Sequence, residues 1–182
     1  MLERVLQPGP RAGQASGAEY DDEVPPQRQA ITLVQNGAAL SVESALLGDP
    51  SLPPGKRPEL TVDAGALGGV QRALWETQRC LLPCMALQSR DPATMRPLYW
   101  HVVGRPVLYL AGIRMVTRVA DRMQPWCLLI SRPQLGTRSP LPLHLAEMTP
   151  RQWLELDGVE AWKHLRLDWL PVDKRVALSF PP

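Results

Sequence analysis

Apolar and polar side chains alternate along much of the chain, and alternation of this kind predicts strands with one buried face. Residues 30–34 and 38–46 flank Asn36-Gly37, which indicates a hairpin because Asn-Gly readily adopts the positive φ angles of a type I′ turn. Residues 96–103 and 105–115 form the strongest strand pair, with Gly104 between them as the turn. Further strands are expected at residues 1–5, 60–64, 126–130 and 169–178, of which the continuously apolar 126–130 is typical of a central strand.

A helical period replaces the alternation in one long segment, which predicts a helix over residues 66–78. Its expected apolar face consists of Leu67, Val70, Leu74 and Trp75. Further along the chain, Thr149 followed by Pro150 is a helix start signal, with an N-cap and a proline in the first turn. That helix is expected to end near residue 156, before Asp157-Gly158, and another helical turn is expected over residues 159–164.

Strands on both sides of one central helix, without regular alternation of strand and helix, are typical of an α+β fold on an antiparallel or mixed sheet. The length fits one domain, and we expect residues 1–182 to form it. Hydrophobic residues make up 45% of the chain, which is enough for it to fold on its own. Four segments are expected to share a sheet: residues 80–83, 97–103, 107–112 and 126–130.

The composition adds little about partners. A net charge of +2 does not by itself indicate nucleic acid or a membrane. Arginine far outnumbers lysine, which suits bidentate phosphate contacts, but a GC-rich genome is the favoured explanation. The odd, low number of cysteines argues against a disulfide scaffold and suits a reducing cytoplasm. The first ten residues lack the apolar core of a secretory signal, and no apolar run reaches the roughly 18 residues of a membrane span.

Several motifs in the same order resemble one family. Residues 79–83, Arg-Cys-Leu-Leu-Pro, match an Arg-Cys-Leu-x-Pro strand, and Asp63-Ala64 lies where that family has Asn-Ala. Residues 1–5 resemble an opening Met-Cys-Gly-Arg-aromatic, residues 139–145 a His-x-Arg-Met-Pro segment, and residues 171–176 a Pro-Val-Ser-x-x-Val segment. The chain is therefore similar to the SOS-response-associated peptidase (SRAP) family, the abasic-site sensors of DNA repair. The resemblance implies a barrel-like sheet with a few packed helices.

The resemblance also implies a chemistry whose residues are missing here. In the family, an N-terminal Cys condenses through its amine and thiol with the aldehyde of an abasic site in single-stranded DNA, assisted by an Asn, a Glu and a His. Leu2 stands at the Cys and has no nucleophilic atom, Asp63 stands at the Asn, Ser89 falls near the Glu, and Arg138 falls near the His. Loss of several members of a catalytic set costs orders of magnitude in rate. We expect no catalytic residue, no cofactor and no metal.

The leading interpretation is therefore a cytoplasmic, catalytically inactive SRAP-like protein with residual, non-covalent binding of single-stranded or abasic DNA. Arg4, Asp63 and Arg138 are the expected DNA-contacting residues, with the two arginines adding positive charge to the former active-site cleft and Asp63 opposing it. The first alternative is an interaction or structural protein, prophage-related, that keeps only the fold. The weaker alternative is an enzyme that uses a relocated thiol, Cys80 or Cys84. The oligomeric state does not follow from the sequence.

Other residue groups have a structural and a functional interpretation. Cys80 and Cys84 are favoured as buried thiols over half of a metal site or a redox pair, and His144 as a core or edge histidine over a replacement for the family histidine. The tryptophans suit base stacking or, for at least four of them, core packing. An arginine-rich stretch suits a phosphate groove or a solvated face about equally well. Its members are Arg72, Arg79, Arg90, Arg96 and Arg105.

Overall fold

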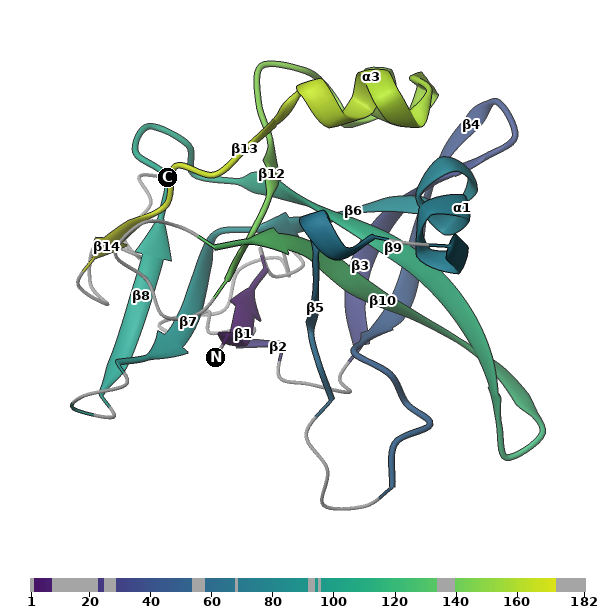
Figure 1. The fold of residues 1–182 in the computed structure, drawn as a ribbon, viewed down its shortest axis with the longest axis horizontal. Helices are drawn as coiled ribbons and strands as arrows, with labels where there is room; N and C mark the ends of the chain where they lie inside the picture. The colour runs from purple at the N-terminus through teal and green to yellow at the C-terminus, as the bar shows by residue number, and fades with distance from the viewer. Residues whose placement is uncertain are drawn as a thin grey trace, which may run out of the picture.

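Strand β10 forms hydrogen bonds with two neighbours that close a ring, and this determines the shape of the larger sheet. In the computed structural model β10 pairs with β9 on one side and with β4 on the other, and β4, β3, β6 and β9 complete the circle. The ring is therefore a five-stranded barrel (Figure 1), antiparallel throughout except between β10 and β4. Its strands are β3 (Gln29–Asn36), β4 (Ala39–Leu47), β6 (Arg79–Cys84), β9 (Leu108–Val119) and β10 (Arg122–Arg132).

The structure describes residues 2–7, 23–24, 29–53, 58–67, 69–91, 94, 96–133 and 140–172. Within these ranges, short strands extend the barrel sheet: β5 (Thr61–Asp63), parallel to β10, with β11 (Leu141–Pro142), β12 (His144–Leu145) and β13 (Leu165–Arg166). The expected strand at residues 169–178 lies partly outside the described residues.

A second, antiparallel sheet packs beside the barrel, at the lower left of Figure 1. Its order is β14-β8-β7-β1-β2. The strands are β1 (Leu2–Leu6), β2 (Glu23–Val24), β7 (Ala86–Arg90), β8 (Pro97–His101) and β14 (Leu170–Val172). Only Met85 separates β6 from β7, so the chain passes directly from the barrel into the second sheet.

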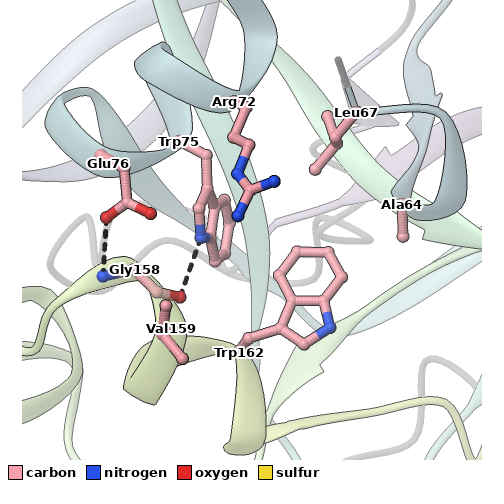
Figure 2. Close-up of a pocket in the computed structure, with 8 residues that line it drawn as sticks. All are labelled: Ala64, Leu67, Arg72, Trp75, Glu76, Gly158, Val159 and Trp162. Carbon is pink, nitrogen blue, oxygen red and sulfur yellow. Dashed lines mark hydrogen bonds between the residues drawn. The ribbon is translucent and has the colours of Figure 1, made fainter. Parts of the chain in front are cut away.

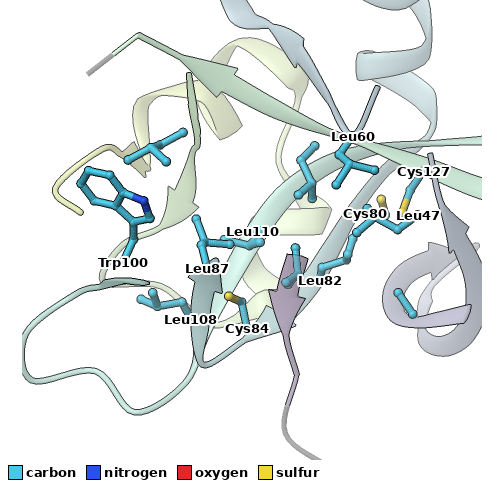
Figure 3. Packing of buried hydrophobic residues seen from close by; sticks show 14 of the residues in the cluster. Leu47, Leu60, Cys80, Leu82, Cys84, Leu87, Trp100, Leu108, Leu110 and Cys127 are labelled. Atoms are coloured by element: carbon cyan, nitrogen blue, oxygen red, sulfur yellow. The ribbon is translucent and has the colours of Figure 1, made fainter. Parts of the chain in front are cut away.

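Alternate residues of the barrel strands build two hydrophobic cores. On β6, Cys80, Leu82 and Cys84 belong to the cluster inside the barrel, which also reaches the second sheet (Figure 3), whereas Leu81 belongs to the cluster under the helices. The helices that cover this outer cluster are η1 (Ala64–Ala66), α1 (Gly69–Thr77), α2 (Pro150–Glu155) and α3 (Gly158–Lys163). The period of two along the strands thus separates an interior from a helix-covered face.

The α+β class and most of the predicted elements are confirmed. The β3–β4 hairpin has the two-residue connection Gly37-Ala38, but only Gly37 has a positive φ, +62°, so the expected type I′ turn is wrong and the φ pattern is that of type II′. Thr149 caps α2 as predicted, in a capping box with Gln152. The helix ends at Glu155, before Asp157-Gly158 as predicted, and Asp157 in addition caps α3 through a hydrogen bond from the Glu160 amide.

Two predictions about packing are wrong. Residues 97–101 do not share a sheet with the barrel strands, and they do not pair with β9: β8 pairs with β7 and β14. Gly104, with φ +77°, does make a turn, but the two strands diverge there into different sheets. Val70, expected on the apolar face of α1, is 75% exposed, whereas Trp75 is buried.

Within the described part of the chain, no helix has both the length and the apolar character that crossing a bilayer requires.

Gly112 lies where β9 closely approaches β10 and β6, and its replacement tests the packing of the barrel. A Cβ atom there would be 3.0 Å from the Leu128 carbonyl oxygen and 3.1 Å from the Cys80 sulfur. Gly112→Ala is therefore expected to destabilise the protein by about 1–3 kcal/mol in urea denaturation followed by tryptophan fluorescence. Gly65→Ala is the control, because its Cβ would meet nothing closer than 3.6 Å. Equal denaturation midpoints for the two variants would contradict this packing.

Candidate functional site

A pocket of about 290 Å³ opens between η1, α1 and α3 (Figure 2). Aromatic and aliphatic side chains form most of its wall, and one guanidinium and one carboxylate interrupt it. The lining residues are Ala64, Leu67, Arg72, Trp75, Glu76, Gly158, Val159 and Trp162. The volume is near the lower end of the range for small-molecule sites.

Two hydrogen bonds join α1 to the start of α3 and so fix the floor of the pocket. The Trp75 indole donates to the Gly158 carbonyl at 3.0 Å, and the Gly158 amide donates to the Glu76 carboxylate at 2.9 Å. A Cβ atom at Gly158 would overlap that carboxylate, so glycine allows the two helices to meet here. The Gly158 amide is one of the free donors of the first helical turn, and Glu76 satisfies it.

The buried guanidinium of Arg79 supports the pocket from below. It donates to the carbonyl oxygens of Trp75, at 3.1 Å, and Leu156, and it lies 5.6 Å from the ring centroids of both Trp75 and Trp153. Burial lowers the pKa of this group, while the carboxylates of Glu76 and Asp157 act in the opposite direction. Arg79 thus holds α1 against the α2–α3 connection by charge-assisted hydrogen bonds.

Trp162 is half-buried and stands at the open side of the pocket. Its ring meets that of Trp75 in an edge-to-face contact, with centroids 4.9 Å apart and an interplanar angle of 82°. The guanidinium of Arg132, at the end of β10, lies 5.4 Å from the centroid of the Trp162 ring. Both contacts restrict the indole, so its position is set before any ligand arrives.

Arg72 is exposed and has no hydrogen bond or ion pair with another described residue. Figure 2 shows its guanidinium projecting from α1 into the pocket, on the side where Trp162 projects from α3. The pocket therefore offers an aromatic surface and a free cation to one ligand. That combination suits a planar group that is attached to an anion.

The structure locates the three predicted DNA-contacting residues only in part. Asp63 is exposed, accepts a hydrogen bond from the Gly65 amide at 2.9 Å, and immediately precedes Ala64 in the pocket wall. Arg4 belongs to β1, in the other sheet, and its side chain is outside the described residues, as is all of Arg138. The involvement of these three residues in DNA binding stays a prediction.

The structure brings together two positions that the resemblance to the SRAP family assigns to that family's catalytic set. Leu2 on β1 pairs directly with Ser89 on β7. Ser89 is buried, and its hydroxyl oxygen accepts a hydrogen bond from the Trp100 indole at 2.9 Å. The positions aligned with the nucleophilic Cys and with the Glu are therefore neighbours, and the residues that occupy them are an aliphatic side chain and an engaged hydroxyl.

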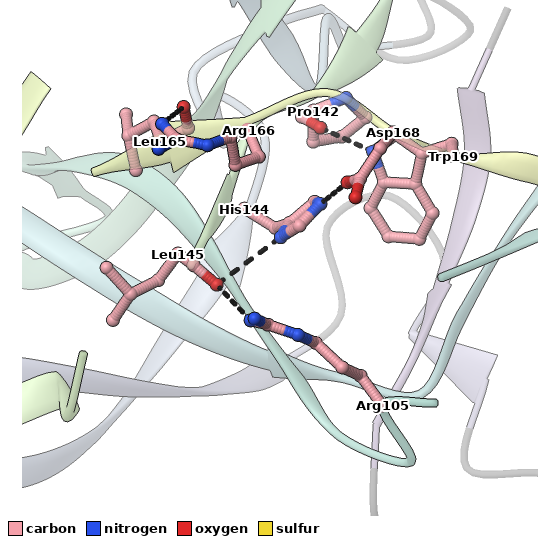
Figure 4. Close-up of polar contacts among 8 residues, drawn as sticks. All are labelled: Arg105, Pro142, His144, Leu145, Leu165, Arg166, Asp168 and Trp169. Atoms are coloured by element: carbon pink, nitrogen blue, oxygen red, sulfur yellow. Dashed lines mark hydrogen bonds and ion pairs between the residues drawn. The ribbon is translucent and has the colours of Figure 1, made fainter. Parts of the chain in front are cut away.

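The three cysteines and His144 are buried among core residues, which favours a structural role for them. Cys80, Cys84 and Cys127 are all buried and none forms a disulfide. A hydrogen bond with Cys127 and then burial raise the pKa of the Cys80 thiol well above its ordinary value, which disfavours the nucleophilic thiolate. His144 is buried beside the Trp169 ring and pairs with the Asp168 carboxylate (Figure 4), as expected for a core histidine.

A phosphate groove is one of two interpretations of the arginine-rich stretch, and two of its arginines are engaged by main-chain carbonyl oxygens instead. Arg79 serves main-chain carbonyls, as described above, and Arg105 donates to the Leu145 carbonyl at 3.2 Å (Figure 4). Arg72 and Arg96 are exposed. Among the described residues, no three His, Cys, Asp or Glu side chains gather closely enough to hold a metal ion.

Solved structures share this fold. A crystal structure of a protein from Bordetella bronchiseptica superposes with a TM-score of 0.67 at 13% identity, covering 94% of this chain and 99% of the other. A phage-related protein from the same organism gives 0.60 at 16% identity, with 94% of each chain covered. A protein from Bacteroides thetaiotaomicron gives 0.57 at 15% identity, covering 82% of this chain and 75% of the other. At these identities the similarity concerns the fold.

Comparison by sequence gives no further relationship: no protein-family model and no curated protein matches the chain. The sequence analysis did not identify the pocket, because its walls come from segments about 90 residues apart. Trp162 and Arg132 carry no motif of their own. In the sequence, the tryptophans suit base stacking and Arg72 suits a phosphate groove, but no local pattern joins them. Asp157-Gly158, which the helix pattern explained as a stop, also begins α3 at the pocket.

Replacement of Arg79 tests the support of the pocket. Arg79→Met keeps much of the side-chain length but leaves several carbonyl oxygens without a donor, so we expect a loss of more than about 3 kcal/mol in urea denaturation. Arg151→Met is the matched control, because Arg151 is exposed and pairs with Glu155 one helical turn away at 3.1 Å. The control should change stability by less than about 0.5 kcal/mol. A similar loss in both variants would show that Arg79 is not a structural anchor.

Proposed function

We propose that this chain is a catalytically inactive relative of the SRAP family that binds single-stranded DNA without forming a covalent bond. The ordered motifs support the relationship, and the pairing of Leu2 with Ser89 supports the alignment, because two cooperating positions should be neighbours. Leu2 supports the loss of chemistry, since leucine has no thiol at the position where the family has its Cys. The phage-related neighbour supports a phage setting.

The main observation behind binding is the pocket, where the Trp162 indole and the Arg72 guanidinium line one cavity and Arg132 lies over the Trp162 ring. Proteins that bind single strands combine aromatic rings, on which bases stack, with cations along the backbone path. Trp162 provides the ring, and Arg72 and Arg132 provide the cations. Asp63 lies one residue from the pocket wall and its carboxylate opposes binding of phosphate.

An interaction protein that keeps only the fold is the second candidate. Val70 and Val159, from the two helices at the pocket, are 75% and 66% exposed. Exposed aliphatic side chains beside a pocket favour contact with another protein. The thiol-enzyme alternative has little support, because Cys80 and Cys84 are buried.

The first prediction from this proposal concerns chemistry. Incubation with single-stranded DNA that contains an abasic site is expected to give no species that survives a denaturing gel, because Leu2 cannot close a ring onto the aldehyde. A parallel incubation with borohydride distinguishes a ring-closed adduct from a reversible imine, because borohydride reduces and so traps an imine that an amine forms without a thiol. An adduct that is stable without borohydride would contradict the proposal.

The second prediction concerns electrostatics. Titration of a labelled oligonucleotide at several salt concentrations should give a log–log slope of about −0.7 for each phosphate contact. The double variant Arg72→Ala/Arg132→Ala should weaken binding and flatten this slope by about 1.4, for two lost contacts. Arg118→Ala/Arg122→Ala is the matched control, because both of its arginines are exposed on the distant β9–β10 hairpin.

The variant Arg4→Ala/Arg138→Ala distinguishes the pocket from the cleft that the resemblance implies. A loss of affinity in this variant alone would move the DNA site to the cleft. If wild-type protein shows no salt-dependent binding of single strands, the proposal is wrong and the interaction protein becomes the leading candidate.

A further inference from the structure

We infer that the pocket between α1 and α3 takes one unpaired nucleobase, so that the protein recognises intact single strands in preference to abasic ones. This inference rests on the proposed function and gives it a ligand. It reverses the preference that the resemblance to abasic-site sensors implies.

The first step is the wall of the pocket, which is mainly apolar and so favours a base over a sugar. Ala64, Leu67, Val159 and the two indoles present mainly carbon to the cavity, and such a surface is satisfied by an apolar planar group rather than by a sugar-phosphate chain. A deoxyribose without its base is small and polar, and it leaves this surface exposed to water. The apolar contact is therefore available to a base and is missing at an abasic site.

The volume provides the second step. About 290 Å³ is enough for one ring system and too small for a helical segment or a base pair. A base in a duplex is stacked and paired, and it would have to leave the helix to enter. Single strands have no such cost, so the pocket selects unpaired bases.

The side chains at the mouth provide the third step. Trp162 is held against Trp75, which is itself fixed by its hydrogen bond to Gly158, so the platform for stacking is preorganised. Arg72 enters the same cavity from α1 and forms no bond with another described residue (Figure 2). Its guanidinium is free to stack on the base or to donate to the adjoining phosphate.

The experiment compares two short oligonucleotides of equal length and charge. One carries normal bases and the other carries tetrahydrofuran residues throughout, which lack both the base and the reactive aldehyde. Wild-type protein should bind the strand with bases at least about fivefold more tightly. The salt slopes of the two strands should be equal, because their phosphates are the same.

Two variants and one control test whether the difference in affinity between the two strands arises at the pocket. Trp162→Leu removes the ring, and Ala64→Leu fills the cavity from η1 without touching the hydrogen bonds between α1 and α3. Each variant should lower the affinity for the strand with bases to that of the baseless strand, and should leave the baseless strand unaffected. Ala73→Leu, at an exposed position of α1, should change neither.

The outcomes separate this inference from the proposed function. Binding of single strands that is equal with and without bases, or that is unchanged in Ala64→Leu, overturns the base pocket while non-covalent binding stands. Absence of binding to either strand overturns both. Equal binding of a duplex overturns the selection of unpaired bases. A mononucleotide that competes as well as the oligonucleotide would assign the pocket to a free nucleotide and overturn its assignment to a DNA strand.

Discussion

The helical half of the molecule depends on the hydrogen bonds that the buried Arg79 guanidinium donates to main-chain carbonyl oxygens. Arg79 is the first residue of a barrel strand, and its guanidinium reaches into the helical layer and donates to carbonyl oxygens on α1 and on the α2–α3 connection. A buried cation of this kind is stable only while its acceptors stay in place, so the three segments are fixed relative to one another. The pocket is the space that remains between them.

Closure of the barrel has a second effect on the site. The barrel holds the middle of β10 between β9 and β4, and the end of β10 pairs with β11 and β5. This end therefore has little freedom, and it carries Arg132 to the Trp162 ring while β5 leads into η1. One side of the pocket, at Ala64 of η1, thus follows directly from a strand of the sheet, and the other sides belong to α1 and α3. A ligand in the pocket would therefore contact both η1, which the sheet positions, and the helices α1 and α3, which pack on the sheet.

Local signals in the sequence predicted local structure well. The β3–β4 hairpin, the capping box at Thr149 and the second helical turn after Asp157 all depend on residues within a few positions of one another. The pairing of β8 with β14 could not be predicted in this way, because β14 lies about 70 residues further along the chain. The pairing of β8 with the preceding β7 was missed because the Gly104 turn is equally compatible with pairing to β9. The same limit applies to the site, because Arg72 and Trp162 are far apart in the sequence and line one pocket only in the folded chain.

The burial of every cysteine inside the barrel cluster gives the molecule an internal reporter. A thiol reagent cannot reach Cys80, Cys84 or Cys127 while the strands stay paired, so the rate of labelling measures how often the barrel opens. No engineered probe is needed, since the sequence has three cysteines and all three lie in this interior. Slower labelling in the presence of a ligand would then show that a molecule bound at the surface restrains the motions of the core.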